Sequence, residues 1–182
     1  SGDPAIGFRI LERSRSAALR EALGGRTAAE TAMLAPADLM ALAARTAPKA
    51  AGKDYVVIEI IEGETLDRLA DDMVRYGQEA GKKNFDRDGE NVRRSAAVVL
   101  IGLKDAAPTG LNCGACGFEK CPPINTLETE FRGPQCAMRL LDLGIALGSA
   151  VKMAALLNVD NRIMYRIGVS ARRLGLIAAD VV

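Results

Sequence analysis

The stretch that decides the fold is Tyr55–Ile61, which has the sequence YVVIEII. It consists almost entirely of β-branched residues, and Gly63 follows shortly after it. A short, continuous run of this kind is typical of a strand that is covered on both faces. Residues 96–103, with the sequence AAVVLIGL, form a second such run. We therefore predict two buried strands at the centre of the domain.

Helices are predicted around these strands. Thr65 is a candidate N-cap for the first, because the apolar residues after it recur at the spacing of an amphipathic helix. These apolar residues are Leu66, Leu69, Ala70, Met73 and Val74. A long helix is predicted over residues 135–157. Another is predicted to start at Asp160 or Asn161 and to end at Gly175, since glycine is favoured after the C-terminus of a helix.

The alternation of strands and helices predicts an α/β domain in which helices are layered on a small central sheet. We expect this domain to span residues 36–182, with Pro36 in the first turn of its first helix. Residues 176–182 are candidates for a third strand. Residues 1–35 are predicted to form an N-terminal helical segment, whose role the sequence does not indicate.

Composition excludes several classes of function. The 182 residues contain 24 Lys and Arg against 23 Asp and Glu, a formal net charge of +1, and only 4% aromatic residues. Nucleic-acid binding uses clustered positive charge and rings on which bases stack, so it is not expected. No uninterrupted apolar stretch approaches the ~20 residues of a membrane span. No secretory signal is recognisable at the start either, so we expect a cytoplasmic protein without a membrane partner.

The apolar content suggests association between subunits. Hydrophobic residues make up 49% of the chain, and many are alanine, leucine and valine on helical patterns. We expect a helix-to-helix interface in a homodimer, although an alanine-rich composition bias would give a similar share.

The chemistry of the chain is concentrated in four cysteines. Cys113, Cys116, Cys121 and Cys136 follow the spacing C-x2-C-x4-C-x14-C, and the chain has no other cysteine and no histidine. Four thiolates in one segment are a ligand set for an iron–sulfur cluster or a metal ion. A reducing compartment argues against structural disulfides. We therefore predict a cluster loop over residues 105–136.

The spacing favours a [4Fe–4S] cluster over zinc. Short intervals allow one loop to hold three corners of a cubane, while Cys136 supplies the fourth ligand from the start of the long helix. Gly114 and Gly117 tolerate positive φ and free backbone N–H groups to point at sulfur. Structural zinc sites usually pair two C-x2–4-C knuckles, whereas here one cysteine stands alone. Zinc and a transient redox-sensing disulfide stay alternatives. Lys120 and Arg139 adjoin the ligands in sequence, where their charge would shift the reduction potential.

The cysteine motif and its surroundings resemble known proteins. Residues 112–121, together with Cys136, resemble the four-cysteine [4Fe–4S] motif of corrinoid iron–sulfur proteins and related electron-transfer subunits. Residues 36–182 resemble a family of bacterial and archaeal proteins described as containing a ferredoxin domain. Beside the cysteine loop, the segments that carry this resemblance are 43–50 (AARTAPKA), 87–93 (RDGENVR), 98–102 (VVLIG), 142–150 (DLGIALGSA) and 160–162 (DNR). The resemblance implies an iron–sulfur cofactor and names no substrate.

The order of the predicted elements is similar to that of the flavin-dependent nitroreductases. Those enzymes are dimers that hold FMN at the subunit interface, with an N-terminal Arg-Ser-x-Arg segment on the phosphate. This chain has Arg-Ser-Arg at residues 13–15. It departs from the nitroreductases because, up to Val182, it supplies neither their further sheet nor their C-terminal arm. The similarity implies FMN only as an alternative cofactor.

The sequence therefore predicts electron transfer through a [4Fe–4S] cluster bound by the four cysteines, with a redox protein as partner. One alternative is an FMN-dependent reductase that carries an accessory cluster. The other is a non-catalytic, zinc-binding interaction module. Whether the protein is an enzyme, and which residues would then be catalytic, is left open.

Overall fold

The computed structural model describes residues 28–121, 123 and 126–182 as a mixed α/β fold. Most of the predicted N-terminal segment 1–35, including residues 13–15, lies outside the described residues. No helix in the described part of the chain is both long enough and apolar enough to cross a membrane. In chain order, the elements are α2 (Ala28–Thr46), the 3-10 turn η4 (Ala50–Gly52), β1 (Val56–Glu62), α3 (Glu64–Glu79), α4 (Phe85–Arg93), β2 (Ala97–Leu103), β3 (Leu127–Glu128), β4 (Arg132–Gly133), α5 (Ala137–Leu156) and α6 (Tyr165–Arg173).

The two predicted strands are confirmed and form the central sheet. β1 and β2 pair antiparallel, with Val56 opposite Leu103 and Glu62 opposite Ala97. The direction follows from the connection between them. The helices α3 and α4 pack on each other and return the chain to the end of the sheet that it left, so β2 runs back along β1.

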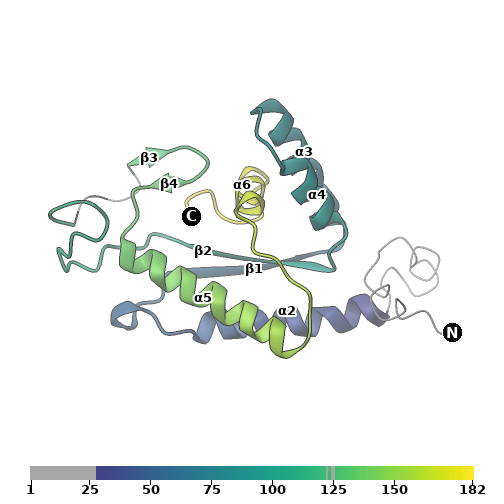
Figure 1. Ribbon diagram of the computed structural model, residues 1–182, viewed down its shortest axis with the longest axis horizontal. Helices are drawn as coiled ribbons and strands as arrows, with labels where there is room; N and C mark the ends of the chain where they lie inside the picture. Colours follow the sequence, from purple (N-terminus) through teal and green to yellow (C-terminus); the bar gives the residue numbers. More distant parts are fainter. Residues whose placement is uncertain (1–27, 122, 124–125) are drawn as a thin grey trace.

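Helices cover both faces of this sheet. On one face, Val98 and Leu100 pack with residues of α3, α4 and α6. On the other face, Leu103 packs with Ala44 of α2 and Ala146 of α5. Figure 1 shows the two layers, with α2 and α5 on one side of the strands and α3, α4 and α6 on the other. Because both faces are buried, the strands are apolar along nearly their whole length.

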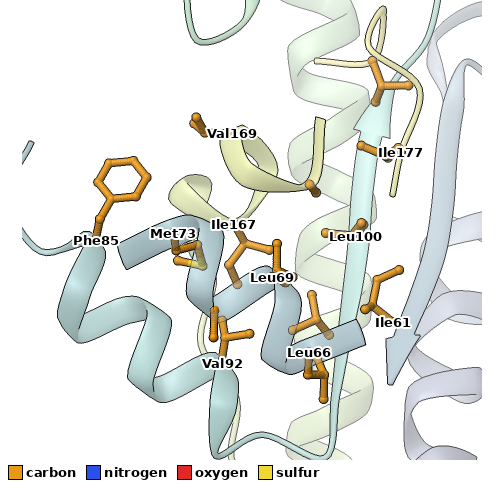
Figure 2. Close-up of a cluster of buried hydrophobic side chains, with 14 residues drawn as sticks. Ile61, Leu66, Leu69, Met73, Phe85, Val92, Leu100, Ile167, Val169 and Ile177 are labelled. Atoms are coloured by element: carbon orange, nitrogen blue, oxygen red, sulfur yellow. The ribbon is translucent and has the colours of Figure 1, made fainter. Parts of the chain in front are cut away.

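The larger core lies between the sheet and the layer of α3, α4 and α6. Leu66, Leu69 and Met73, from the predicted apolar stripe, are 0% exposed there. Figure 2 shows this stripe among side chains from the strands, α4 and α6. The amphipathic helix predicted from the spacing is therefore confirmed.

The helix α2 begins earlier than predicted. It starts at Ala28, and Pro36, which was expected in the first turn, lies in its interior. A proline inside a helix removes one hydrogen bond and costs about 3 kcal/mol. Packing offsets this cost, because α2 lies along α5 and the sheet and buries Ala37 and Ala44.

Two other helix starts also differ from the prediction. The N-cap of α3 is Gly63 rather than Thr65, and its φ of 61° lies in the left-handed region that favours glycine. The helix α6 starts at Tyr165 rather than around residue 160. The chain uses residues 157–164 to pass from the layer of α5 to the layer of α6 (Figure 1).

The predicted third strand forms only at its end. Val181 makes an isolated antiparallel bridge with Lys104. Val182 exchanges two backbone hydrogen bonds with Leu103, at 2.7 and 2.9 Å. Both contacts lie at the end of β2 from which the cysteine loop departs.

Candidate functional site

The loop that carries the cysteines is held by the core at both ends. It leaves β2 beside Ala106, which is 2% exposed, and ends at Cys136, directly before α5. Figure 1 shows the loop projecting beyond the end of the sheet, near the start of α5. The core therefore fixes where the loop begins and ends.

Cys136 lies in an environment that favours its thiolate. It is the N-cap of α5 and is 7% exposed, and its Sγ lies 3.8 Å from Oγ1 of Thr109. Burial on its own raises the pKa of this thiol. The nearby backbone N–H groups of Thr109, Arg139 and Met138, together with the Thr109 hydroxyl, outweigh burial and hold the pKa of this thiol below its usual value. The thiolate is the form of cysteine that binds metals.

The other three cysteines lie on a tightly turned stretch. Oδ1 of Asn112 accepts a hydrogen bond from the N–H of Cys121 at 2.9 Å, which closes this stretch into a ring. Within the ring, the N–H of Gly117 donates to the carbonyl of Gly114 at 2.9 Å. The two glycines have φ of 86° and 72°, so their predicted positive φ is confirmed, while the N–H of Gly117 is taken up by a carbonyl rather than by a sulfur.

Asn112 is a site residue that the sequence analysis missed. Its φ is 49°, and asparagine is one of the few residues that tolerates the left-handed region. Its side chain also hydrogen-bonds to backbone, as asparagine does in turns. An asparagine directly before the first cysteine of the motif was the signal that could have identified it.

The structure does not bring the four sulfurs together. Cys113 is exposed, Cys116 and Cys121 are half-buried, and Cys136 is buried; none is in a disulfide. Within residues 28–121, 123 and 126–182, no three cysteine or acidic side chains lie close enough together to hold a metal ion. The site thus has one thiol fixed at a helix start and three on an accessible loop.

The chemistry of this donor set fits an iron–sulfur cluster. Four thiols are available in one segment, and one of them already has a lowered pKa. Thiolates also suit zinc. Hydrogen bonds to sulfur are one of the means by which proteins tune iron–sulfur clusters, and Cys136 has the Thr109 hydroxyl 3.8 Å from its sulfur.

The two cations predicted near the ligands lie in different environments. Lys120 is exposed on the loop, whereas the Arg139 residue is 1% exposed within α5. Arg139 donates from Nε to the carbonyl of Ala107 at 3.0 Å and from Nη1 to Oδ2 of Asp142 at 3.0 Å. The spacing did not reveal this burial, because arginine and aspartate three apart on a helix form the same pair on an exposed face.

A separate groove of about 760 Å³ lies along β2, between the two helical layers. Leu143 and Leu147 of α5 line it from one layer, and Ile167 of α6 lines it from the other. Its polar lining includes Asn161 and Arg162. This volume falls within the range of small-molecule sites.

Comparison with known proteins relates the chain to others by sequence. Residues 132–182 match the model of a family described as uncharacterized protein containing a ferredoxin domain. An uncharacterized protein of Archaeoglobus fulgidus is 50% identical over 147 residues, which make up 79% of this chain and 79% of the relative. No solved structure matches the chain significantly.

Proposed function

This chain belongs to the family of uncharacterized proteins containing a ferredoxin domain, and from this premise we propose that it transfers single electrons through a [4Fe–4S] cluster. Cys113, Cys116, Cys121 and Cys136 would hold the cluster. When bound, such a cluster supplies reversible one-electron chemistry. A redox protein would deliver or accept the electron.

The observation that carries this proposal is the environment of Cys136. Its sulfur is buried at the start of α5, 3.8 Å from Oγ1 of Thr109, and the polar groups around it hold the pKa of the thiol below its usual value. A metal ligand must lose its proton, and here the fold favours that loss before anything binds. Cys136 would therefore be the fixed ligand, the anchor cysteine, and the three loop cysteines would complete the ligand set around the cluster.

The exposed part of the loop suits the approach of a partner protein. Beside the exposed Cys113, Leu111 is 65% exposed and Phe118 is 45% exposed. Electron-transfer complexes are among the smallest protein interfaces, and aromatic side chains are enriched in interface cores. We expect the partner to contact the exposed side chains of Leu111 and Phe118.

Removal of the anchor tests the ligand set. The full chain is purified without oxygen, supplied with iron and sulfide, and analysed for both elements. The unchanged chain is expected to hold about four iron and about four sulfide. Cys136→Ser should lose most of both, because the ligand with the preformed environment is gone. Thr46→Ser, on α2, is the control and should load fully.

Two results would contradict the proposal. Full iron content in Cys136→Ser would show that the ligand set is wrong. Stoichiometric zinc without sulfide, in a preparation never exposed to oxygen, would favour the zinc-binding module instead.

The groove along β2 supports a second candidate function, an FMN-dependent reductase that carries the cluster as an accessory. Its apolar walls, including Leu143 and Leu147, and its volume of about 760 Å³ suit a planar ring system. Titration of the full chain with FMN tests this candidate by quenching of flavin fluorescence. Saturable one-to-one binding is expected if the groove holds flavin, and unquenched fluorescence would retire the reductase.

A further inference from the structure

One buried guanidinium joins three separate segments next to the cysteine loop. Arg139 lies three residues after Cys136 on α5, and its side chain is 1% exposed. Its Nε donates to the carbonyl of Ala107 at 3.0 Å, and its Nη1 donates to the carbonyl of Ala50 at 2.9 Å. Its Cζ also lies 4.7 Å from the centre of the Tyr55 ring.

Asp142 completes this arrangement. Its Oδ2 pairs with Nη1 of Arg139 at 3.0 Å, and its Oδ1 accepts the N–H of Ala50 at 2.7 Å. The pair thus binds the loop at Ala107 and both backbone polar groups of Ala50 in the η4 turn. The carbonyl of Ala50 also accepts the N–H of Lys53 at 3.3 Å within η4, so the pair adds to the hydrogen bonds of this turn and ties it to the loop at Ala107.

A pair of this kind is not the most stable way to fill the space. Burying two charges costs more than burying apolar side chains of equal volume, and such replacements are often neutral or stabilising. Removal of only one partner is strongly destabilising, because it leaves an uncompensated buried charge. The stability of the fold therefore does not explain why this pair is present. Its hydrogen bonds to the backbone of the loop do explain it.

The fixed carbonyl lies close in sequence to Thr109, whose Oγ1 is 3.8 Å from the sulfur of Cys136. Ala107 is two residues before Thr109, whose N–H and hydroxyl both act on the sulfur of Cys136. Holding Ala107 therefore holds the hydrogen bonds that surround this sulfur. From the other direction, the backbone N–H of Arg139 donates to the carbonyl of Cys136 at 2.9 Å.

We propose that Arg139, paired with Asp142, is a positioning residue that fixes the loop base around Cys136 and thereby sets the retention and the reduction potential of the bound cluster. This inference rests on the proposed function. The direction in which each charge shifts the reduction potential is defined. Reduction adds negative charge to the cluster, so a neighbouring positive charge favours reduction and raises the potential. In the paired state, the two side-chain charges nearly cancel.

The experiment compares four variants of the full chain under anaerobic conditions. They are Arg139→Met, Asp142→Asn, the double variant that combines both, and the control Arg173→Met. Arg173 also pairs with a buried aspartate, Asp72, at 3.1 Å between α6 and α3, although Arg173 itself is 38% exposed. Cluster release to a chelator, reduction midpoint potential and thermal midpoint are measured for each variant.

Opposite shifts of the potential are expected for the single variants. Arg139→Met leaves Asp142 unpaired and should shift the potential to more negative values. Asp142→Asn leaves Arg139 unpaired and should shift it to more positive values. The double variant should return close to the potential of the unchanged chain, yet lose the cluster about 10- to 100-fold faster, since its loop is no longer held. Arg173→Met should change only the thermal midpoint.

A readout without the cluster separates this inference from the proposed function. In the cluster-free chain, alkylation of Cys136 should be much slower than that of Cys113, and Arg139→Met should accelerate it about tenfold, while Arg173→Met should not. Equal release rates, potentials and alkylation rates in Arg139→Met and the unchanged chain would overturn the positioning role. Failure of the unchanged chain to take up iron and sulfide would refute the proposed function, while the alkylation rates would still decide the role of Arg139.

Discussion

Asn112 shows how a single side chain can shape the cysteine loop. It lies directly before Cys113, has a φ of 49°, and accepts the N–H of Cys121 through Oδ1 at 2.9 Å. The ring that this bond closes contains Cys116 and ends at Cys121. Loss of the acceptor would free the N–H of Cys121 and allow the loop cysteines to spread apart.

We predict that Asn112→Ala weakens cluster retention without unfolding the chain. The variant should release iron to a chelator about tenfold faster, because the support of the ligands is lost rather than a ligand itself. The matched control is Asn158→Ala, since Asn158 is also exposed and has a similar φ of 54°, but lies after α5. Equal release rates in Asn112→Ala and the unchanged chain would show that the ring does not support the ligands.

At the residue scale, the sequence predicts which residues supply the ligand atoms, but not which side chains are buried around them. The four cysteines, the positive φ of Gly114 and Gly117, and the helix start after Cys136 could all be predicted, because each depends on local spacing or on one residue type. The burial of Arg139 could not, since it depends on the carbonyls of segments far away in the sequence. The convergence of the four sulfurs stays a prediction.

At the scale of elements, an ion pair with one buried partner joins α6 to α3. Asp72 of α3 is 2% exposed, and its Oδ2 lies 3.1 Å from Nε of Arg173 on α6. Burial on its own raises the pKa of Asp72. Hydrogen bonds from Arg173 and Arg75 contribute to holding this pKa below its usual value despite burial. Folding therefore favours the charged form of Asp72.

The stability of the chain should depend on Asp72 in acid. A lowered folded-state pKa means that its contribution is complete above the unfolded-state value, about 4, and is lost as the pH falls through the folded-state pKa. Asp72→Asn should lower the free energy of unfolding at neutral pH by about 2 kcal/mol and flatten its decline below about pH 4. Urea unfolding across this pH range measures both effects.

The exposed neighbour Asp71 provides the control for this experiment. Asp71→Asn should leave the acid decline as steep as in the unchanged chain, because Asp71 is exposed and its ion pair with Arg93 lies at the surface. A decline in Asp72→Asn that runs parallel to that of the unchanged chain would rule out this role of Asp72.

Among the elements, agreement with prediction follows the strength of the local signal. The strands Val56–Glu62 and Ala97–Leu103 and the helix Glu64–Glu79 were predicted because their apolar patterns are continuous or strictly periodic. The start of α2 was missed because packing carries the helix through Pro36 against its local preference. The antiparallel direction of the strands depends on how α3 and α4 pack, which no local pattern encodes.

At the scale of the whole molecule, α2 and α5 carry an apolar surface that a single chain leaves uncovered. The two helices lie side by side on one face of the sheet (Figure 1). The exposed apolar residues of the two helices and of the C-cap of α5, each between 39% and 66% exposed, are Leu39, Leu42, Leu140, Leu141, Ile145, Leu156 and Leu157. Large exposed apolar patches are rare on monomers and mark interaction surfaces.

We predict that two copies of the chain associate through this surface. Sedimentation of the purified chain should give twice the mass of one chain. The double variant Leu141→Glu with Ile145→Glu should give a single chain, since buried unpaired carboxylates oppose association. Leu127→Glu, on β3, should leave the mass unchanged although Leu127 is more exposed, at 68%, than Leu141 or Ile145. A single-chain mass for the unchanged protein at high concentration would disprove the dimer.

Electron paramagnetic resonance of the anaerobically loaded chain, recorded during stepwise reduction, tests the proposed electron transfer most directly. The predicted result is a signal of a reduced [4Fe–4S] cluster that reaches about one unpaired electron per chain and disappears reversibly on oxidation. The same signal should be lost in Cys136→Ser. A chain that contains stoichiometric zinc, or that shows no signal at any potential between about −700 and +450 mV, would contradict it.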